Sequence, residues 1–274
     1  MRSPGDSVAR YTLHSLLGRG GMGEVYEAED KVLERRVALK LLPADGDAEA
    51  RLRMLREARA AAAFEHPNVV TVFDAGLTDE GGPAEQAYIA MELVRGSSLR
   101  SFVGDATTSL AVKIGWLADV ARALAAAEAA GLIHRDIKPD NVLLTAAGVP
   151  KLADLGVARD LLGPTGRHRT QLGARIGTPS YMSPEQAQGL EVDLTSDLFS
   201  VGLLAFEMLT GRKAFDGASD LEILTAIVRD QPQIDLLHPR CPAPMVDVIA
   251  QALTKNPAQR FASARAMARA LGQG

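Results

Sequence analysis

One short run in the middle of the chain gathers many polar groups. The stretch HRDIKPDN, residues 134–141, holds two basic residues, two carboxylates, a histidine and a carboxamide. The preceding LADVARALAAAEAAGLI has helical character, and the VLL that follows has strand character. We therefore predict that this run forms a loop held between two packed elements, which makes it the first candidate for a site of chemistry.

A second candidate is the glycine-rich run LGRGGMGEVY, in which Gly18, Gly20 and Gly23 fit the spacing G-x-G-x-x-G. In dinucleotide-binding units such glycines open a helix, whereas the EVYEAED that follows here alternates as a strand does. We therefore interpret the run as a glycine-rich hairpin whose backbone can approach phosphates without Cβ clashes. A glycine-rich turn without a ligand remains the alternative for this motif alone.

A lysine and a glutamate add to the phosphate hypothesis. Lys40 ends the apolar run VALK, and a lysine that points into a cleft needs an anionic partner. Glu57 is a candidate, because Met54 and Ala61 place it on the packing face of a predicted helix. Each residue alone would more often be a solvated surface residue. Together with the hairpin they predict a Lys–Glu pair that reaches phosphates.

The predicted secondary structure changes from mainly strands to mainly helices near the middle of the chain. From Tyr11 to about Leu93 we predict short strands, with one helix in DAEARLRMLREARAAAAF. The predicted strands are YTLHSLL, EVYEAED, RVALKLL, VVTVFDAG and AYIAMEL. After a hinge at about residues 94–96, we predict helices at about residues 109–130, 194–209 and 219–228, with two more towards the C-terminus.

Composition narrows the function classes. The 274 residues suit one large domain or two small lobes, and the 47% hydrophobic fraction is ample for a core. A net charge of −4 argues against nucleic-acid binding. Cys241 is the only cysteine, which excludes an internal disulfide and a cysteine-rich zinc site. With no signal peptide or membrane segment in the sequence, we expect a cytoplasmic chain, although a longer parent protein could carry a membrane anchor.

The order of motifs resembles that of a protein kinase, specifically the bacterial serine/threonine kinases of the eukaryotic (Hanks) type, from about Tyr11 to Leu271. In chain order they are GRGGMG, VALK, Glu57, HRDIKPDN, DLG, GTPSYMSPE, SDLFSVG and NPAQR. One such motif alone is weak evidence, but this many motifs in the same order make a chance match very improbable. The resemblance implies an α+β, two-lobed protein kinase fold over residues 1–274. Its small antiparallel sheet lobe with one major helix would span about 11–94, and its larger, mainly helical lobe about 95–271.

The resemblance also implies roles for the polar run, since phosphoryl transfer requires positioning and charge neutralisation. Asp136 would accept or orient the proton of the attacking hydroxyl, and Lys138 would place a cation near the transferring phosphoryl group. Asn141 and Asp154 would hold Mg²⁺, with Mn²⁺ as a substitute. Lys40 completes this catalytic set.

The implied ATP site lies in the small lobe and the hinge. Met91 would line the back of the adenine pocket, Val25 and Ala38 would cover the ring, and the Glu92 carbonyl and the Val94 backbone would hydrogen-bond the base. Ordinary core packing is the alternative for the apolar positions. The remaining predicted ATP-binding residues are Leu17, Gly18, Arg19, Gly20, Gly21, Met22, Gly23, Lys40 and Glu57.

Four further residues resemble structural ones in kinases. Glu185 and Arg260 would form a buried ion pair that anchors the activation segment. Asp197 would hold the backbone of the catalytic loop, and His134 would be a packed histidine rather than a base.

The long segment that begins near Asp154 indicates a switch. Its cations are Arg159, Arg167, His168, Arg169 and Arg175. A phosphate on Thr170 would add roughly −1.5 to −2 charges and bridge Arg135 to this segment. Thr178 resembles a threonine that kinases need unmodified. A solvated basic loop without a regulatory role is the alternative.

The predicted function is therefore that of a non-specific, ATP-dependent serine/threonine protein kinase. It would act on serine and threonine hydroxyls of proteins and associate with itself for activation-loop autophosphorylation, with no nucleic-acid partner and no membrane segment in this chain. A pseudokinase binding module is one alternative, but such proteins usually lack the lysine, the base or the metal ligand. A small-molecule phosphotransferase is another, but these generally lack a long segment that ends in SPE. The connection at residues 77–88 has no role that its pattern indicates.

Overall fold

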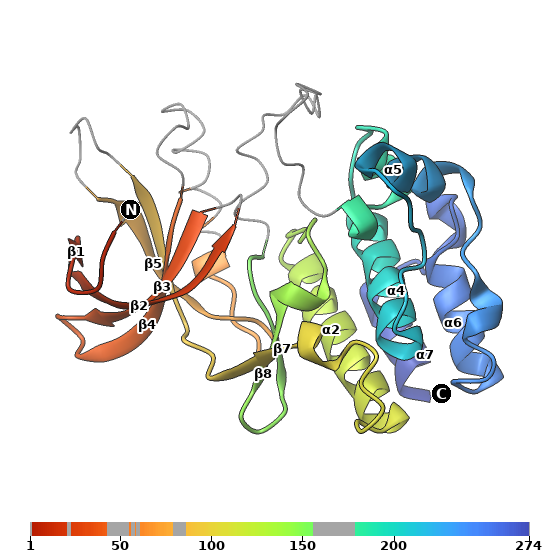
Figure 1. Cartoon of the computed structure of the whole chain (residues 1–274), viewed down its shortest axis with the longest axis horizontal. Coiled ribbons are helices and arrows are strands. Elements are labelled where there is room, and N and C mark those ends of the chain that lie inside the picture. The colour runs from red at the N-terminus through yellow and green to blue at the C-terminus, as the bar shows by residue number, and fades with distance from the viewer. Residues whose placement is uncertain are drawn as a thin grey trace. The chain divides into compact units, whose positions relative to one another are not determined.

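The structure, a computed structural model, describes residues 2–20, 23–42, 55, 58, 61–78, 86–155 and 179–273. Contacts divide the chain into two compact units. The first contains Met1–Glu65 and Val70–Val94, and the second contains His66–Val69, Arg95–Leu155 and the described residues after 178. Each unit is described by itself, and its elements can be followed in Figure 1.

The first unit is built on a six-stranded antiparallel sheet with the order β1-β2-β3-β4-β6-β5. Its strands are β1 (Ser7–Val8), β2 (Tyr11–Gly20), β3 (Gly23–Asp30), β4 (Arg35–Leu41), β5 (Val72–Leu77) and β6 (Ala87–Met91). The five predicted strands are confirmed, and β2 extends further because the hairpin pairing continues to Gly20 and Gly23. Of the predicted helix, the described residues Leu55, Ala58 and Ala61 are helical and buried. Residues 79–85, in the connection between β5 and β6, lie outside the described ranges.

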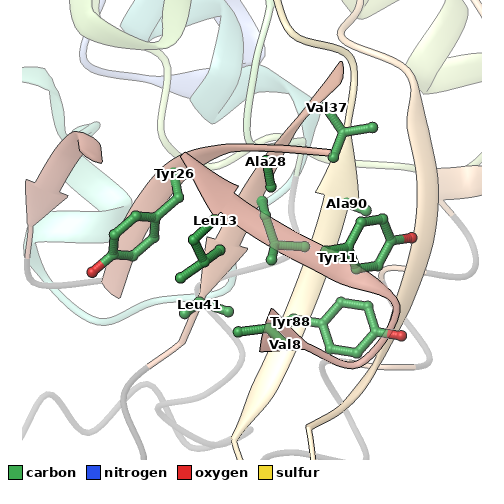
Figure 2. Packing of buried hydrophobic residues seen from close by; sticks show 10 residues of the cluster. Val8, Tyr11, Leu13, Tyr26, Ala28, Val37, Leu41, Tyr88 and Ala90 are labelled. Carbon is green, nitrogen blue, oxygen red and sulfur yellow. The ribbon is translucent and has the colours of Figure 1, made fainter. Parts of the chain in front are cut away.

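One face of this sheet carries a hydrophobic core, shown in Figure 2. Its members are Val8, Tyr11, Leu13, Tyr26, Ala28, Val37, Leu39, Leu41, Tyr88 and Ala90. Side chains alternate between the two faces of a strand. Because Val37, Leu39 and Leu41 of β4 belong to the core cluster, Ala38 and Lys40 lie on the opposite face. The core cluster covers one face of the sheet, so only the opposite face, which carries Ala38 and Lys40, is left to contact a ligand.

The second unit is mainly helical, as predicted. Its α-helices in the described ranges are α2 (Leu110–Ala129), α3 (Pro184–Ala187), α4 (Leu194–Thr210), α5 (Asp220–Arg229), α6 (Ala243–Ala252) and α7 (Ala264–Gln273). Helix α4 is buried from Ser196 to Thr210 and packs against α2 and α6. Side chains of Ser109, Asp193 and Ser219 accept first-turn N–H groups, which explains where α2, α4 and α5 begin. No helix among the described residues is both long and apolar enough to cross a membrane.

A small antiparallel sheet with the order β7-β8-β9 completes the second unit. Its strands are β7 (Gly96–Ser98), β8 (Val142–Thr145) and β9 (Pro150–Leu152). The strand predicted from VLL is therefore confirmed as β8. Short 3₁₀ turns join these elements: η1 (Leu99–Phe102), η2 (Pro139–Asn141), η4 (Pro179–Tyr181), η5 (Ile234–Leu236) and η6 (Pro257–Gln259). The polar run HRDIKPDN thus lies between α2 and β8, with η2 at its end.

Candidate active site

Asp197 fixes the backbone of the polar run from the first turn of α4. Its side chain is buried, with Oδ2 accepting the N–H of His134 at 2.7 Å and Oδ1 accepting the N–H of Arg135 at 2.7 Å. Burial raises the pKa of the Asp197 carboxyl above its ordinary value, while the two backbone donors and the charge of Arg135 oppose that rise. The predicted role of Asp197 as the holder of this loop is confirmed.

His134 is a structural residue, as predicted. The ring is buried, Nδ1 accepts the N–H of Asp136 at 3.2 Å, and Nε2 lies 2.8 Å from the carbonyl oxygen of Ala153. Because Nδ1 acts as an acceptor, Nε2 carries the proton and donates it to Ala153. Both ring nitrogens are therefore engaged, and the histidine ties the polar run to the chain just before Asp154.

Asp136 has one carboxylate oxygen held and one open. Oδ2 accepts hydrogen bonds from Nζ of Lys138 at 2.7 Å and from Nδ2 of Asn141 at 2.9 Å. The same Nδ2 also lies 2.8 Å from the carbonyl oxygen of Asp136. Oδ1 has no hydrogen-bond partner in the part of the chain that the structure describes. A carboxylate held in this way can accept a proton through its open oxygen from a hydroxyl placed beside it.

Asn141 and Asp154 come from adjacent backbone segments. The N–H of Ala153 donates to the carbonyl oxygen of Asn141 at 2.8 Å, and Val142 pairs with Leu152 in the β8–β9 register. The hydrogen bonds of the Asn141 side chain run from Nδ2, so its amide oxygen has no partner among the described residues. A carboxamide oxygen and a carboxylate are donors of the kind that hard divalent cations prefer. These residues therefore fit a divalent metal.

Four residues predicted to bind the nucleotide share one face of the first unit's sheet. Val25 pairs with Lys40 across β3 and β4, and Ala38 pairs with Met91 across β4 and β6. Residues directly opposite in an antiparallel pair point to the same side. These residues lie on the face opposite the core cluster. That face carries both a cation and apolar side chains, which suit the phosphates and the base of an adenine nucleotide.

The two strands predicted for the glycine hairpin are present and pair up to Gly20 and Gly23. Gly23 has φ +115°, and a Cβ there would lie 2.0 Å from the carbonyl oxygen of Leu41, so only glycine fits. Among the residues that the structure describes, a Cβ at Gly18 or Gly20 would meet nothing within 4 Å. Packing within the protein therefore explains Gly23, whereas the space beside Gly18 and Gly20 is open to a ligand.

An ion pair closes this hairpin across its two strands. Nη2 of Arg19 lies 2.8 Å from Oε1 of Glu24, and the hydroxyl of Tyr26 donates to Oε2 of Glu24 at 2.6 Å. The hydrogen bond from Tyr26 and the neighbouring charge of Arg19 lower the pKa of Glu24. Leu17 is half exposed on β2. The Arg19–Glu24 pair therefore links β2, one residue after Gly18, to β3.

At the end of β6, the N–H of Glu92 is paired, while the N–H of Val94 is not paired with any described residue. The N–H of Glu92 donates to the carbonyl oxygen of Thr71 at 2.8 Å. The N–H of Val94 has no hydrogen-bond partner among the residues that the structure describes. It is therefore available to a ligand at the predicted hinge.

Some predicted residues lie outside the described ranges. They are Gly21, Met22, Glu57, Thr170 and Thr178, together with the cations at Arg159, Arg167, His168, Arg169 and Arg175. The Lys40–Glu57 pair and the switch at Thr170 therefore remain predictions.

The predicted ion pair between Glu185 and Arg260 is confirmed. It is bidentate and buried, with Nη1 2.7 Å from Oε1 and Nη2 3.0 Å from Oε2. Ser196 adds a hydrogen bond to Glu185, and the guanidinium lies 4.8 Å from the ring centre of Phe199. Burial alone would raise the pKa of Glu185, but the hydrogen bonds from Arg260 and Ser196 hold it below its ordinary value.

A polar network beside the polar run HRDIKPDN was not predicted. Arg100 contacts Asp140 at 2.8 Å, Glu207 at 2.9 Å and the hydroxyl of Tyr181 at 2.7 Å. Lys213 lies 3.1 Å from Glu207. The network connects the residue before Asn141 to the turn η4. Glu207 in the apolar helix sequence AFEMLT was the one signal that could have revealed it, since a carboxylate in a buried helix needs partners.

Residues 11–271 match the protein kinase domain family, so the chain belongs to this family. It is 46% identical to the serine/threonine-protein kinase PksC of Streptomyces coelicolor, over 94% of this chain and 48% of that protein. It is 40% identical to the serine/threonine-protein kinase PknB of Mycobacterium tuberculosis, over 97% of this chain and 43% of that protein. The chain thus spans less than half the length of these relatives.

Solved structures support the same assignment. The crystal structure of the Mycobacterium tuberculosis PknI kinase domain aligns with a TM-score of 0.77 at 30% identity, covering 100% of this chain and 99% of that one. The resemblance to bacterial serine/threonine kinases and the two-lobed α+β fold class are both confirmed. Protein kinases in general use ATP, a divalent metal and protein substrates.

Proposed function

We propose that this domain transfers the γ-phosphate of ATP to serine and threonine hydroxyls of proteins. The observation that carries the proposal is the Asp136 carboxylate, held through Oδ2 by Lys138 and Asn141 with Oδ1 open. The relatives named serine/threonine-protein kinases support this class of acceptor. Lys138, two residues after Asp136, fits the serine/threonine pattern.

The proposed step follows from this geometry. The acceptor oxygen forms a bond to the γ-phosphorus while the bond from that phosphorus to the β,γ-bridging oxygen breaks. Oδ1 of Asp136 accepts the proton of the acceptor hydroxyl. Lys138 stands beside the same carboxylate and offsets negative charge on the transferring group. Positioned general bases of this kind contribute about 10²–10⁴ to a rate.

Asn141 and Asp154 would hold Mg²⁺, and Mn²⁺ could replace it with the same oxygen donors. The open amide oxygen of Asn141 and the closeness of the two backbone segments support this assignment. A divalent ion held there neutralises charge on the phosphates of the nucleotide.

The ATP site is proposed on the first unit. Val25, Ala38 and Met91 would cover the adenine ring, and the open N–H of Val94 would bind its edge beside the backbone of Glu92. Lys40, on the same sheet face, would contact the phosphates, with Glu57 as its partner. Leu17, Arg19 and the glycines of the hairpin would cover the phosphates from β2 and β3. The shared sheet face supports this grouping.

We also propose that the domain phosphorylates itself on Thr170 when two copies associate. The charge pattern supports this hypothesis: Arg135 follows His134 in the catalytic run, and the segment around Thr170 is rich in arginine. The need for ATP and Mg²⁺ makes the cytoplasm the expected place of action.

The experiment incubates the purified chain with labelled ATP, Mg²⁺ and a generic basic protein, and then maps the modified residues by mass spectrometry. We expect phosphoserine and phosphothreonine. Label that stays with free nucleotide, or that appears only on small molecules, would show that the proposed function is wrong.

A further inference from the structure

A buried glutamine joins the catalytic run, residues 134–141, to helix α3. Gln186 is 6% exposed. Its Oε1 accepts the N–H of Ser183 at 2.9 Å, and its Nε2 donates to the carbonyl oxygen of Arg135 at 3.0 Å. One end of the amide therefore completes the capping box of α3, while the other reaches a residue 51 positions earlier in the chain.

The residue that it reaches has an unfavourable backbone. Arg135 has φ +67°, in the left-handed region, which costs a residue with a Cβ about 1–2 kcal/mol. Such a conformation persists only where its surroundings hold it. Here the N–H of Arg135 donates to Asp197 at 2.7 Å, and its carbonyl accepts from Gln186. The two contacts restrain Arg135 from opposite ends.

The carbonyl of Arg135 belongs to the peptide plane that leads into Asp136. Its direction therefore sets where the Asp136 side chain begins. Helix α3 is itself fixed, because Glu185, the neighbour of Gln186, forms the buried ion pair with Arg260. The amide of Gln186 is thus presented to the catalytic run from an anchored element.

We propose that Gln186 is a positioning residue for Asp136, acting through the carbonyl of Arg135. This inference rests on the proposed kinase function. Gln186 contacts no reacting group. It keeps the left-handed turn at Arg135 in place, so that Asp136 meets Lys138 and Asn141 with its second oxygen open.

Gln186→Glu tests the contact with the smallest change. The substitution keeps the side-chain size and the oxygen that accepts from Ser183, but it replaces the amide donor by a carboxyl oxygen. That oxygen can donate to the Arg135 carbonyl when protonated and repels it when ionised. The ratio of variant to parent kcat should therefore fall about tenfold as the pH rises through the pKa of the introduced carboxyl, with the KM for ATP unchanged.

Gln188→Glu is the matched control. Gln188 follows two residues later on an exposed position, and its Nε2 donates to Pro184 at 3.0 Å rather than to the catalytic run. The chemical change is the same. The ratio of its kcat to that of the parent should stay close to one at every pH.

A second readout does not depend on catalysis. At pH 8, amide hydrogen exchange in the peptide that covers residues 134–137 should be faster in Gln186→Glu than in the parent and in Gln188→Glu. A kcat ratio that is independent of pH, or exchange equal to that of the parent, would overturn the inference. If the parent transferred no phosphate, the proposed function would be wrong, and the exchange comparison would still decide whether Gln186 holds the turn.

Discussion

Nζ of Lys138 lies 2.7 Å from Oδ2 of Asp136, and the two side chains are only 18% and 21% exposed. The ion pair fixes the direction in which the other oxygen of Asp136 faces. It also places a cation beside the Asp136 carboxylate within one short loop. Both residues belong to the polar run of the second unit. One loop therefore supplies the proton acceptor, Asp136, and the cation that neutralises charge, Lys138.

The proposed metal site predicts the effect of losing one ligand. Asp154→Ala should lower phosphoryl transfer at least a hundredfold at any accessible Mg²⁺ concentration, because the remaining donor, Asn141, is neutral. Asp235→Ala, which removes an exposed carboxylate, is the control. A chelator should stop the parent, and Mg²⁺ or Mn²⁺ should restore it. Near-parental turnover of Asp154→Ala in a peptide assay would show that the metal assignment is wrong.

The proposed switch predicts a specific modification. Protein expressed alone should carry phosphate on Thr170, and Asp136→Asn protein should not, because the phosphate comes from the domain itself. Thr170→Ala should show reduced activity, since no phosphate can then bridge the segment to Arg135. Mass spectrometry and a peptide assay measure both effects. An active parent with unmodified Thr170, or undiminished activity of Thr170→Ala, contradicts the hypothesis.

Breaking the Glu185–Arg260 pair should be costly. Arg260→Met leaves a buried carboxylate without its cation, and the loss of one partner of a buried pair typically costs about 3–5 kcal/mol. Arg122→Met, which breaks an exposed pair with Asp119, should cost less than about 1 kcal/mol. Urea denaturation at pH 7 compares the two. Equal losses would show that the buried pair does not anchor α3.

The same pair predicts an acid dependence. Since Arg260 and Ser196 hold the pKa of Glu185 below its ordinary value, the unfolded chain binds a proton at this site more readily than the folded chain. The stabilisation is therefore present above the unfolded pKa and is lost as the pH falls through the folded pKa. Between pH 7 and pH 4, the parent should lose more free energy of unfolding than Glu185→Gln. The reverse order would contradict this assignment.

Lys255 predicts a further rise of stability with pH, in the alkaline range. Burial of its ammonium, whose Nζ lies 3.8 Å from the ring centre of Phe215, lowers the pKa from 10.5 to about 8, and Asp230 only partly offsets this. Between these two values the unfolded lysine still holds a proton that the folded one has released. The folded state therefore gains stability as the pH rises from 8 towards 10.5. The gain in the free energy of unfolding from pH 7.5 to pH 9.5 should be smaller in Lys255→Met than in the parent. Equal gains would contradict it.

The sequence was sufficient for the long elements and for residues within motifs. Strands β2 to β6 and helices α2 and α4 to α7 have clear periodicity, and the roles of Asp197, His134 and the Glu185–Arg260 pair followed from the kinase resemblance. Strand β1 and helix α3 have only two and four residues, which is too short for a periodic pattern.

Contacts between distant parts of the chain were harder to predict. Arg100 meets Asp140 and Glu207, which lie 40 and 107 residues away, and Gln186 meets Arg135 across 51 residues. No spacing rule links such residues, because their distance is set by how α3, α4 and the loops pack. The resemblance identified which residues act, whereas the structure was needed to show what holds them.

The most direct test of the account compares Asp136→Asn with the parent in transfer of phosphate from ATP to a peptide, with ATP binding and thermal unfolding measured on the same samples. The amide keeps the shape of the carboxylate but cannot accept the hydroxyl proton. We predict that transfer falls by about 10²–10⁴ while ATP binding and the unfolding temperature stay close to those of the parent. Equal transfer rates for the two proteins would contradict the role of Asp136 and, with it, the proposed mechanism.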